Sequence, residues 1–409
     1  MRAPTPIQFP ISQQFPMNHM NHIDMATIFY YTKFGKRLLF LFFILFGEDP
    51  MPAKLEDIAR ESGFSIATVS RVLNHSTYPV RAAVREKILE TAQTMGYRPN
   101  LAARSLRTDR SNTVGILVDD LLSPFTPPVV RGIQDQLRDN NCIGLIVNSD
   151  WDLEQEQAGI VSLLSRPVDG IIFVEYSHPT SNEALASANK PGVFVHRLFG
   201  TAIKNSVVPD DIYGASLAVE HLIHLGHRSI AHISGLENWH NSKERLEGYK
   251  KTLEKHGIAL VEEWIQPGDW EIEGGYRGAQ SLLKLPNRPT AIFASNDLMA
   301  LGAIYAIQDA GLSVPHDIAV VGYDNREFTW IARPNITTVE MPVYEMGRIA
   351  AEILLQQIAD GSRENEEVKV KGELIVRDTC GASESQKTNR RFERNTSLRR
   401  LLLNKEPEN

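Results

Sequence analysis

Cysteine is almost absent from this sequence, which has two, Cys142 and Cys380, among 409 residues. Two isolated cysteines exclude a disulfide-stapled scaffold and fit a reducing compartment. The apolar stretch Leu38–Phe46 has nine residues, whereas a membrane-spanning helix needs roughly 20. No small-residue cleavage site follows that stretch, so it does not form a complete signal peptide. We therefore expect a cytoplasmic protein without a membrane anchor.

The motifs that mark several enzyme classes are also missing. The sequence contains no GxSxG, no GxxxxGK[ST] and no HExxH, which argues against the hydrolases, nucleotide-binding enzymes and metalloproteases that use them. His221, His224 and His227 invite a metal site, but no carboxylate completes a tight ligand set. Gly226-His227 fits a helix end better. We expect no enzymatic activity, no metal and no cofactor.

Charge is unevenly distributed along the chain, although the formal net charge is only −7. Residues 51–110 carry 10 Lys and Arg against 6 Asp and Glu, whereas residues 111–380 carry 22 against 37. A small basic segment ahead of a large acidic one indicates a polyanion-binding module attached to a different domain.

The pattern of residues 51–99 predicts a helix-turn-helix domain. Ser65 can cap a second helix over Ile66–Leu73. The spacing Ala59-x3-Gly63-x5-Val69 places a small residue where two helices approach, a glycine in the turn, and an apolar residue between the helices.

A third helix is expected over about Val80–Met95. Its inward residues are expected to be Val84, Ile88, Leu89 and Ala92. The alternative is a three-helix bundle whose charged face is merely solvated.

In a helix-turn-helix the second helix enters the major groove of DNA. Arg71 can bind guanine bidentately, and Ile66 and Ala67 can contact thymine methyl groups. The polar residues around them suit phosphates, which position a protein without specifying sequence. The expected DNA-binding residues of this segment are Ser65, Ile66, Ala67, Thr68, Ser70, Arg71 and Asn74.

Residues 100–110 predict a short hinge helix that Asn100 can cap. Two helical turns are marginal in water without a partner, and the same helix of a second subunit is the simplest one. Leu106 would then protrude as an apolar wedge of the kind that minor-groove proteins insert into a base step. A linker without function is the alternative.

These segments resemble the lactose/galactose-repressor family of bacterial transcription regulators. The motifs are Leu55-Glu-Asp-Ile-Ala59, Thr68-Val-Ser-Arg-Val-Leu-Asn74, Gly96-Tyr-Arg-Pro-Asn100 and Ala102-Ala-Arg-Ser-Leu106, and the similarity runs from about Lys54 to Gly381. The resemblance implies that Ile66, Ala67 and Arg71 read the operator. It also implies that Ala103 and Leu106 enter the central minor groove.

Residues 111–380 alternate short β-branched runs with helical stretches, and the pattern restarts after Asp211. It predicts two doubly wound, parallel-sheet α/β lobes of the periplasmic-binding-protein type, which bind effector and dimerise. We expect lobe 1 to hold about 111–211 and 342–370, and lobe 2 about 212–341 and 371–380. Ligands bind beyond the carboxyl ends of strands in such folds, so the expected effector site is a cleft between the lobes.

Planar hydrogen-bonding groups and aromatic rings follow the predicted strands. Such a set suits a polyhydroxylated molecule such as a sugar. The resemblance implies that Arg245, Trp270, Asn296 and Asp324 bind effector. Where many family members have Asp-Arg, this chain has His196-Arg197, which leaves the role of His196 open. The full expected effector set is Phe125, His196, Arg197, Arg245, Trp270, Asn296 and Asp324.

Two alternatives stay open for this set. Trp270 followed by Glu271 would also suit a purine, by stacking and a carboxylate acceptor. Helix capping is an alternative role for Asn296 and Asp297.

Residues 1–50 are expected to be a leader outside the fold, with Met51 as the working start. Residues 381–409 are polar and basic, and we expect a disordered tail. The whole pattern predicts an effector-controlled transcription regulator, a repressor by resemblance, that binds a palindromic operator as a homodimer, with a tetramer as the alternative. The rival interpretation is a periplasmic-type sugar-binding protein without DNA function; the basic 51–110 segment favours the regulator.

Overall fold

The computed structural model describes residues 53–73, 78–97, 110–174, 190–196, 205–361 and 367–388. The chain divides into two compact units, residues 1–100 and 101–409. The predicted leader, most of the predicted hinge helix, and residues 389–409 lie outside the described residues.

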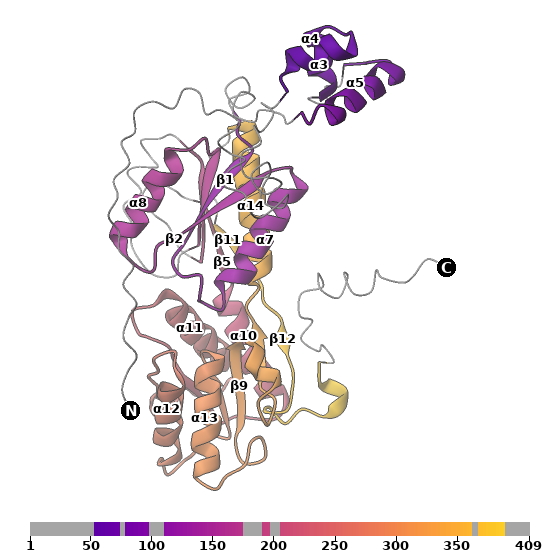
Figure 1. Cartoon of the computed structure of the whole chain (residues 1–409). Helices are drawn as coiled ribbons and strands as arrows, with labels where there is room; N and C mark the ends of the chain where they lie inside the picture. The colour runs from indigo at the N-terminus through magenta and orange to yellow at the C-terminus, as the bar shows by residue number, and fades with distance from the viewer. Residues whose placement is uncertain are drawn as a thin grey trace, which may run out of the picture. The chain divides into compact units, whose positions relative to one another are not determined.

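The described residues of the first unit form three short helices, α3 (Leu55–Ser62), α4 (Ile66–Leu73) and α5 (Ala82–Thr94) (Figure 1). Gly63 ends α3 with φ of 78°, a left-handed conformation that favours glycine, and its N–H donates to the Ala59 carbonyl. The expected tight turn is therefore confirmed, and it directs α4 across α3.

Six buried side chains form the core of this unit: Ile58, Ala59, Val69, Val72, Ile88 and Ala92. The expectation that Leu89 faces inward is wrong, because 43% of this residue is exposed. Val84, Ile88 and Ala92 are spaced four residues apart and form one narrow apolar stripe on α5. Leu89 lies beside this stripe and not on it.

In the second unit, the strands that the structure describes form two six-stranded sheets. The first has the strand order β11-β5-β4-β3-β1-β2, and all its pairs are parallel. Its strands are β1 (Thr113–Val118), β2 (Ile143–Asn148), β3 (Gly170–Val174), β4 (Gly192–Val195), β5 (Ser206–Pro209) and β11 (Glu367–Val370).

The second sheet has the order β12-β10-β9-β8-β6-β7, and only β12 runs antiparallel. Its strands are β6 (Ile230–Ile233), β7 (Ile265–Gln266), β8 (Ala291–Ala294), β9 (Ala319–Asp324), β10 (Thr337–Glu340) and β12 (Leu374–Ile375). The expected fold class, an all-α head followed by two doubly wound parallel-sheet lobes, is confirmed.

Helices cover both faces of each sheet (Figure 1). On the first sheet, α7 (Thr126–Asp139) and α14 (Val343–Asp360) share one core with the strands, and α8 (Leu153–Leu164) packs on the other face. On the second sheet, α10 (Asp211–His224) and α11 (His240–Lys255) share one core, and α12 (Ile272–Leu283) and α13 (Asp297–Asp309) share the other.

Glycines let these helices approach each other closely. A Cβ atom on Gly302 of α13 would lie 2.0 Å from the Ile272 carbonyl oxygen at the start of α12. A Cβ on Gly347 of α14 would lie 2.1 Å from the Val129 carbonyl oxygen of α7. Backbone contacts backbone at both places, so each helix pair is held at a fixed separation.

The chain passes between the two sheets three times among the described residues. It leaves β5 for α10, returns from β10 to α14, and crosses again from β11 to β12. We call the two halves lobe 1 (around the first sheet) and lobe 2 (around the second sheet). Three crossings allow the lobes to rotate against each other without unfolding either.

The folded chain extends beyond the predicted boundary at residue 380. Thr388 exchanges hydrogen bonds with Val376, and Lys387 forms an ion pair of 2.8 Å with Asp378. A short 3-10 helix over Glu384–Gln386 comes directly before Lys387 in the chain. Across the described ranges, none of the helices has the length and apolar character needed to cross a membrane.

Candidate functional site

The exposed face of α4 carries the residues expected to read DNA. Val69 and Val72 are fully buried in the three-helix core, while Ile66, Ala67 and Arg71 are exposed. The Ser65 hydroxyl accepts a hydrogen bond from the Thr68 N–H at 3.2 Å, which caps the start of α4 as expected. One face of this helix is therefore free of the core and presents one cation and two apolar side chains.

Arg71 lies over the ring of Tyr78, with its Cζ atom 4.3 Å from the ring centroid. The Tyr78 ring holds the Arg71 guanidinium through a cation–π contact, which does not involve the N–H donors of the guanidinium. Of the other expected DNA-binding residues, Thr68 and Ser70 are half-buried on α4. Asn74, Asn100, Ala103 and Leu106 lie outside the described residues.

The expected effector residues of lobe 2 gather around Arg245 of α11. Its Nε donates to Asp211 Oδ1 at 2.8 Å, and its Nη1 lies 3.4 Å from Asp324 Oδ1 and also donates to the Ser295 carbonyl. The guanidinium stacks on Tyr323, 3.6 Å from the ring centroid, and lies 5.7 Å from that of Trp270. Only 1% of Arg245 is exposed, so its charge is balanced inside the protein.

Burial changes the protonation of these acids. It raises the pKa of Asp211 despite the nearby Arg245, and it raises the pKa of Asp324 to about 7 against the opposing charges of Arg245 and Arg326. The pKa of Asp297 rises well above its usual value because the side chain is buried and faces Asp324. For Arg245 burial alone would lower the pKa, but Asp211 and Asp324 outweigh it and raise it.

Asn296 fixes the position of Trp270. Its Oδ1 accepts from the Met299 N–H and caps α13, and its Nδ2 donates to the Trp270 carbonyl, both at 2.8 Å. The indole packs onto Gly235, where a Cβ atom would lie 2.1 Å from the ring. Among the described residues the indole Nε1 has no hydrogen-bond partner. The capping role weighed from the sequence is thus present, and it serves to orient the tryptophan.

Lobe 1 brings two of the expected residues to the same place. Burial, and to a smaller extent the charge of Arg245, lowers the pKa of His196 to about 3. This imidazole is therefore neutral at pH 7. Phe125 begins α7 and packs partly against the lobe 2 core around Tyr323. Arg197 lies outside the described residues.

Backbone strain is concentrated in this cluster. His196, Trp270, Asp324 and Asn325 have φ values of 71°, 70°, 109° and 56°, in the region that non-glycine residues rarely adopt. Such conformations persist only where the surroundings enforce them, and they are frequent at ligand sites.

Sequence reasoning missed several members of the cluster. Asp211 is the closest acid to Arg245, and Asp297 accepts the Arg326 N–H at 2.8 Å. Ser242, 2% exposed, has a hydroxyl without a partner among the described residues, and it lies beside Gly235 next to the Trp270 indole. A buried hydroxyl without a partner is a ready ligand contact. Ser242 could have been found from its place shortly before Arg245 in the chain, and Asp297 from its place directly after Asn296.

His221 and His224 of α10, and His227 just beyond its end, point to different neighbours. His221 Nε2 lies 3.2 Å from Cys380 Sγ, His224 faces the His256 ring edge-on, and His227 Nδ1 lies 2.9 Å from Thr290 Oγ1. The part of the chain that the structure describes has no group of three or more His, Cys, Asp or Glu that could hold a metal ion.

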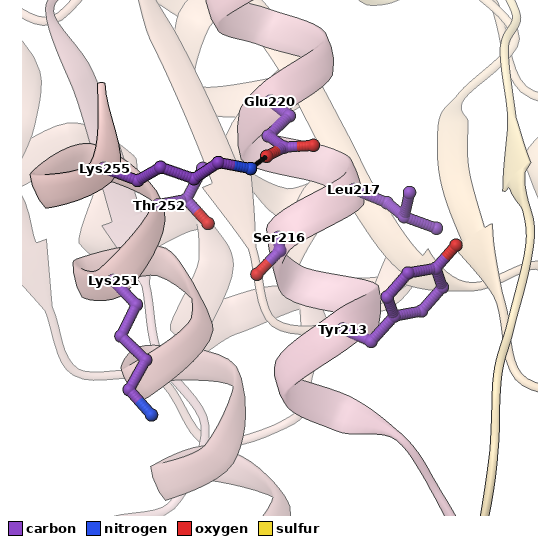
Figure 2. A pocket seen from close by; sticks show the side chains of 7 residues that line it. All are labelled: Tyr213, Ser216, Leu217, Glu220, Lys251, Thr252 and Lys255. Atoms are coloured by element: carbon purple, nitrogen blue, oxygen red, sulfur yellow. Dashed lines mark hydrogen bonds and ion pairs between the residues drawn. The ribbon is translucent and has the colours of Figure 1, made fainter.

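A surface pocket of 240 Å³ lies between α10 and α11 (Figure 2). Its lysines are already paired, since Lys255 binds Glu220 and Lys251 binds Glu247, each at 2.6 Å. It is lined by Tyr213, Ser216, Leu217, Glu220, Lys251, Thr252 and Lys255. None of the expected effector residues lines it, so it is separate from the cluster around Arg245.

Comparison with known proteins identifies the family of this chain. Residues 54–100 match the bacterial regulatory proteins of the lacI family, and residues 219–380 match a periplasmic binding protein-like domain. The catabolite control protein A of Priestia megaterium is 36% identical over 306 residues, which cover 74% of this chain and 92% of that protein. The chain belongs to the lacI family.

Two further relatives extend this lacI-family assignment. The ribose operon repressor of Haemophilus influenzae is 33% identical over 81% of this chain and 98% of that protein. Among solved structures, a lac repressor dimer bound to operator and an anti-inducer is similar, with a TM-score of 0.65, 29% identity, and coverage of 81% of this chain and 100% of that one. These relatives are transcription regulators and not enzymes, in agreement with the sequence analysis.

Proposed function

We propose that this lacI-family chain is a transcriptional repressor that binds operator DNA through α4 and is controlled by a small molecule bound between lobes 1 and 2. The observation that carries the proposal is the exposed α4 face with Arg71, on a helix whose opposite face is fixed by fully buried Val69 and Val72. A rigid helix with a free cationic face is what major-groove recognition requires.

Two copies of the chain act together on DNA. A single α4 has eight residues and contacts only a few base pairs, so a second copy is needed for a site long enough to be specific. The similar lac repressor structure is a dimer on operator. We propose a homodimer on an operator with two inverted half-sites, with residues 100–110 of both copies in the central minor groove.

The cluster around Arg245 serves as the effector site, together with Phe125, His196 and Arg197. The carboxylates of Asp211 and Asp324, the Trp270 indole face and the unpartnered Ser242 hydroxyl form a set that suits a sugar-like ligand. One relative is named the ribose operon repressor, and this name is consistent with a sugar ligand for that relative.

The effector acts by changing the relative setting of the lobes. It contacts His196 and Phe125 of lobe 1 and Arg245, Trp270, Asn296 and Asp324 of lobe 2, so its binding favours one setting over another. The resulting change in operator affinity is of order 1–3 kcal/mol, and operator binding changes effector affinity by the same factor. Access to chromosomal DNA places the protein in the cytoplasm.

Selection of duplexes from a randomised pool tests this function. The full chain is incubated with the pool, and bound duplexes are amplified and sequenced over several rounds. We expect an inverted repeat with half-sites about one helical turn apart, centre to centre. Failure to enrich any sequence over rounds, with a folded and dimeric protein, would overturn the proposal.

A further inference from the structure

Arg326 follows Asp324 at the end of β9, and its backbone is tied to the cluster around Arg245. Its N–H donates to the buried carboxylate of Asp297 at 2.8 Å. Its side chain is half-buried, and its charge lowers the pKa of Asp324 against the larger effect of burial. Arg326 thus stands beside the proposed effector site, and sequence reasoning did not include it.

The guanidinium of Arg326 faces lobe 1. Its Cζ atom lies 6.0 Å from the ring centroid of Phe125, which belongs to lobe 1, and 5.6 Å from that of Phe328. No hydrogen bond or ion pair of this guanidinium is made with any residue that the structure describes. Its N–H donors are therefore available at the boundary between the lobes.

The two other arginines near Asp297 and Asp324 have used their donors. Arg245 is bound by two carboxylates and a carbonyl. Arg377 donates to the Thr329 hydroxyl, the Ile336 carbonyl and the Asn325 side chain. In contrast, the guanidinium of Arg326 donates no hydrogen bond to any described residue.

We propose that Arg326 binds an anionic group of the effector, and that the effector is a phosphorylated or acidic sugar. The proposal rests on the function proposed above and adds the class of ligand. A guanidinium presents its donors in a planar fork that matches two oxygens of a phosphate or a carboxylate. The polar cluster around Arg245 then receives the hydroxyl groups of the same molecule.

The charges around the site allow an anion to bind there. Arg245, Arg326 and Arg377 lie near Asp211, Asp297 and Asp324, and Glu340 and Asp378 also act on Arg377. Burial is the main cause that raises the pKa values of the three aspartates, so it disfavours their charged forms in the folded protein. The guanidinium of Arg326 forms no ion pair with a described residue, so an anionic group of the ligand can pair with it.

A thermal-shift screen of the full chain with matched ligands tests the proposal. The panel pairs ribose with ribose 5-phosphate and glucose with glucose 6-phosphate and glucuronate, and includes inorganic phosphate, all at one ionic strength. We expect an anionic member to raise the melting temperature by mass action while its neutral parent does not. Phosphates and carboxylates in the panel distinguish the two sources of the anionic group.

Variants assign the effect to Arg326. Arg326→Gln should weaken binding of the active anion on the order of tenfold or more, because a charge-assisted hydrogen bond is lost. Arg326→Lys keeps the charge without the fork and should give an intermediate loss. Arg288→Gln, an exposed arginine of the same lobe, is the matched control and should not change ligand binding.

Three results would overturn the inference: a neutral sugar that binds as tightly as its charged counterpart, an anion whose binding survives Arg326→Gln, or no response to any anionic member. The wild-type chain is tested in parallel against its selected duplex. If it selects a duplex but prefers neutral ligands, only this inference fails. If it selects no duplex, the proposed function fails whatever the ligands do.

Discussion

At the scale of single residues, Asp324 combines burial, strain and a shared charge. It is 9% exposed, its φ is 109°, and it lies between Arg245 and Arg326. Its carboxyl therefore gains and loses its proton near neutral pH.

Stability should depend on pH through Asp324. Its pKa rises from 3.8 to about 7 on folding, so between these values the folded state holds a proton that the unfolded state has released. The contribution of this group to the free energy of unfolding should fall as the pH rises from 4 to 7, by at most about 1.4 kcal/mol per pH unit. Urea unfolding of wild type and Asp324→Asn at several pH values measures this, and the stability of the wild type relative to the variant should fall as the pH rises. A relative stability that does not change with pH would contradict this assignment.

Arg71 should specify one base per half-site. Arg71→Ala should cost about 1–3 kcal/mol on the preferred duplex and relax the choice at that position alone. Binding to a set of single-base variants of the selected duplex measures this. Arg60→Ala, another exposed arginine of the same unit, serves as the control. Equal weakening on every variant duplex would reassign Arg71 to the phosphate backbone.

Elements in this chain are positioned by close backbone contact, most clearly at the pairing of α12 with α13. Replacing Gly302 by Ala should destabilise the protein by about 1–3 kcal/mol, because the new Cβ would meet the Ile272 carbonyl. This outweighs the roughly 1 kcal/mol that alanine gains in a helix interior. Thermal or urea unfolding measures the change.

Gly278 on α12 is the matched control for Gly302. A Cβ there would meet the Ile233 side chain at 3.2 Å or more and no backbone atom, so Gly278→Ala should destabilise the protein less than Gly302→Ala. Equal effects at the two positions would show that helix propensity, and not the α12–α13 contact, decides the outcome.

Elements with a strong local pattern could be predicted from the sequence. The turn at Gly63 and the alternation of strands and helices over residues 111–380 were predicted because glycine spacing and β-branched runs mark them directly. The two-residue strands β7 and β12 are too short to show any period. Asp211 was missed as a partner of Arg245 because only the tertiary fold brings them together, across 34 positions in the chain.

At the scale of the whole molecule, an ion pair joins the lobes beside the effector cluster, since Glu244 directly precedes Arg245 in the chain. Lys369 of β11 in lobe 1 lies 2.6 Å from Glu244 of α11 in lobe 2. Glu244 is mostly buried, and His240 also contacts it at 3.3 Å. Rotation of the lobes would change this distance, so the pair contributes to the preferred setting.

A charge-swap cycle tests this contact between the lobes. Lys369→Glu and Glu244→Lys should each lower stability, and the double variant should recover part of the loss, with a coupling of about 1 kcal/mol. Urea unfolding gives the values. The same cycle at Lys255 and Glu220, which pair within lobe 2, is the control and should leave duplex affinity unchanged. If the charge swap at Lys369 and Glu244 changes stability but not duplex affinity, this ion pair plays no part in regulation.

The central claim is that a basic helical unit binds duplex DNA under the control of a ligand-binding body. It is tested most directly by the affinity of the full chain for its selected inverted repeat as the salt concentration rises. We predict that log K falls linearly with log salt, and that the repeat keeps a large advantage over a scrambled duplex at every salt concentration. An affinity that does not change with salt, or that is equal for both duplexes, would contradict the account.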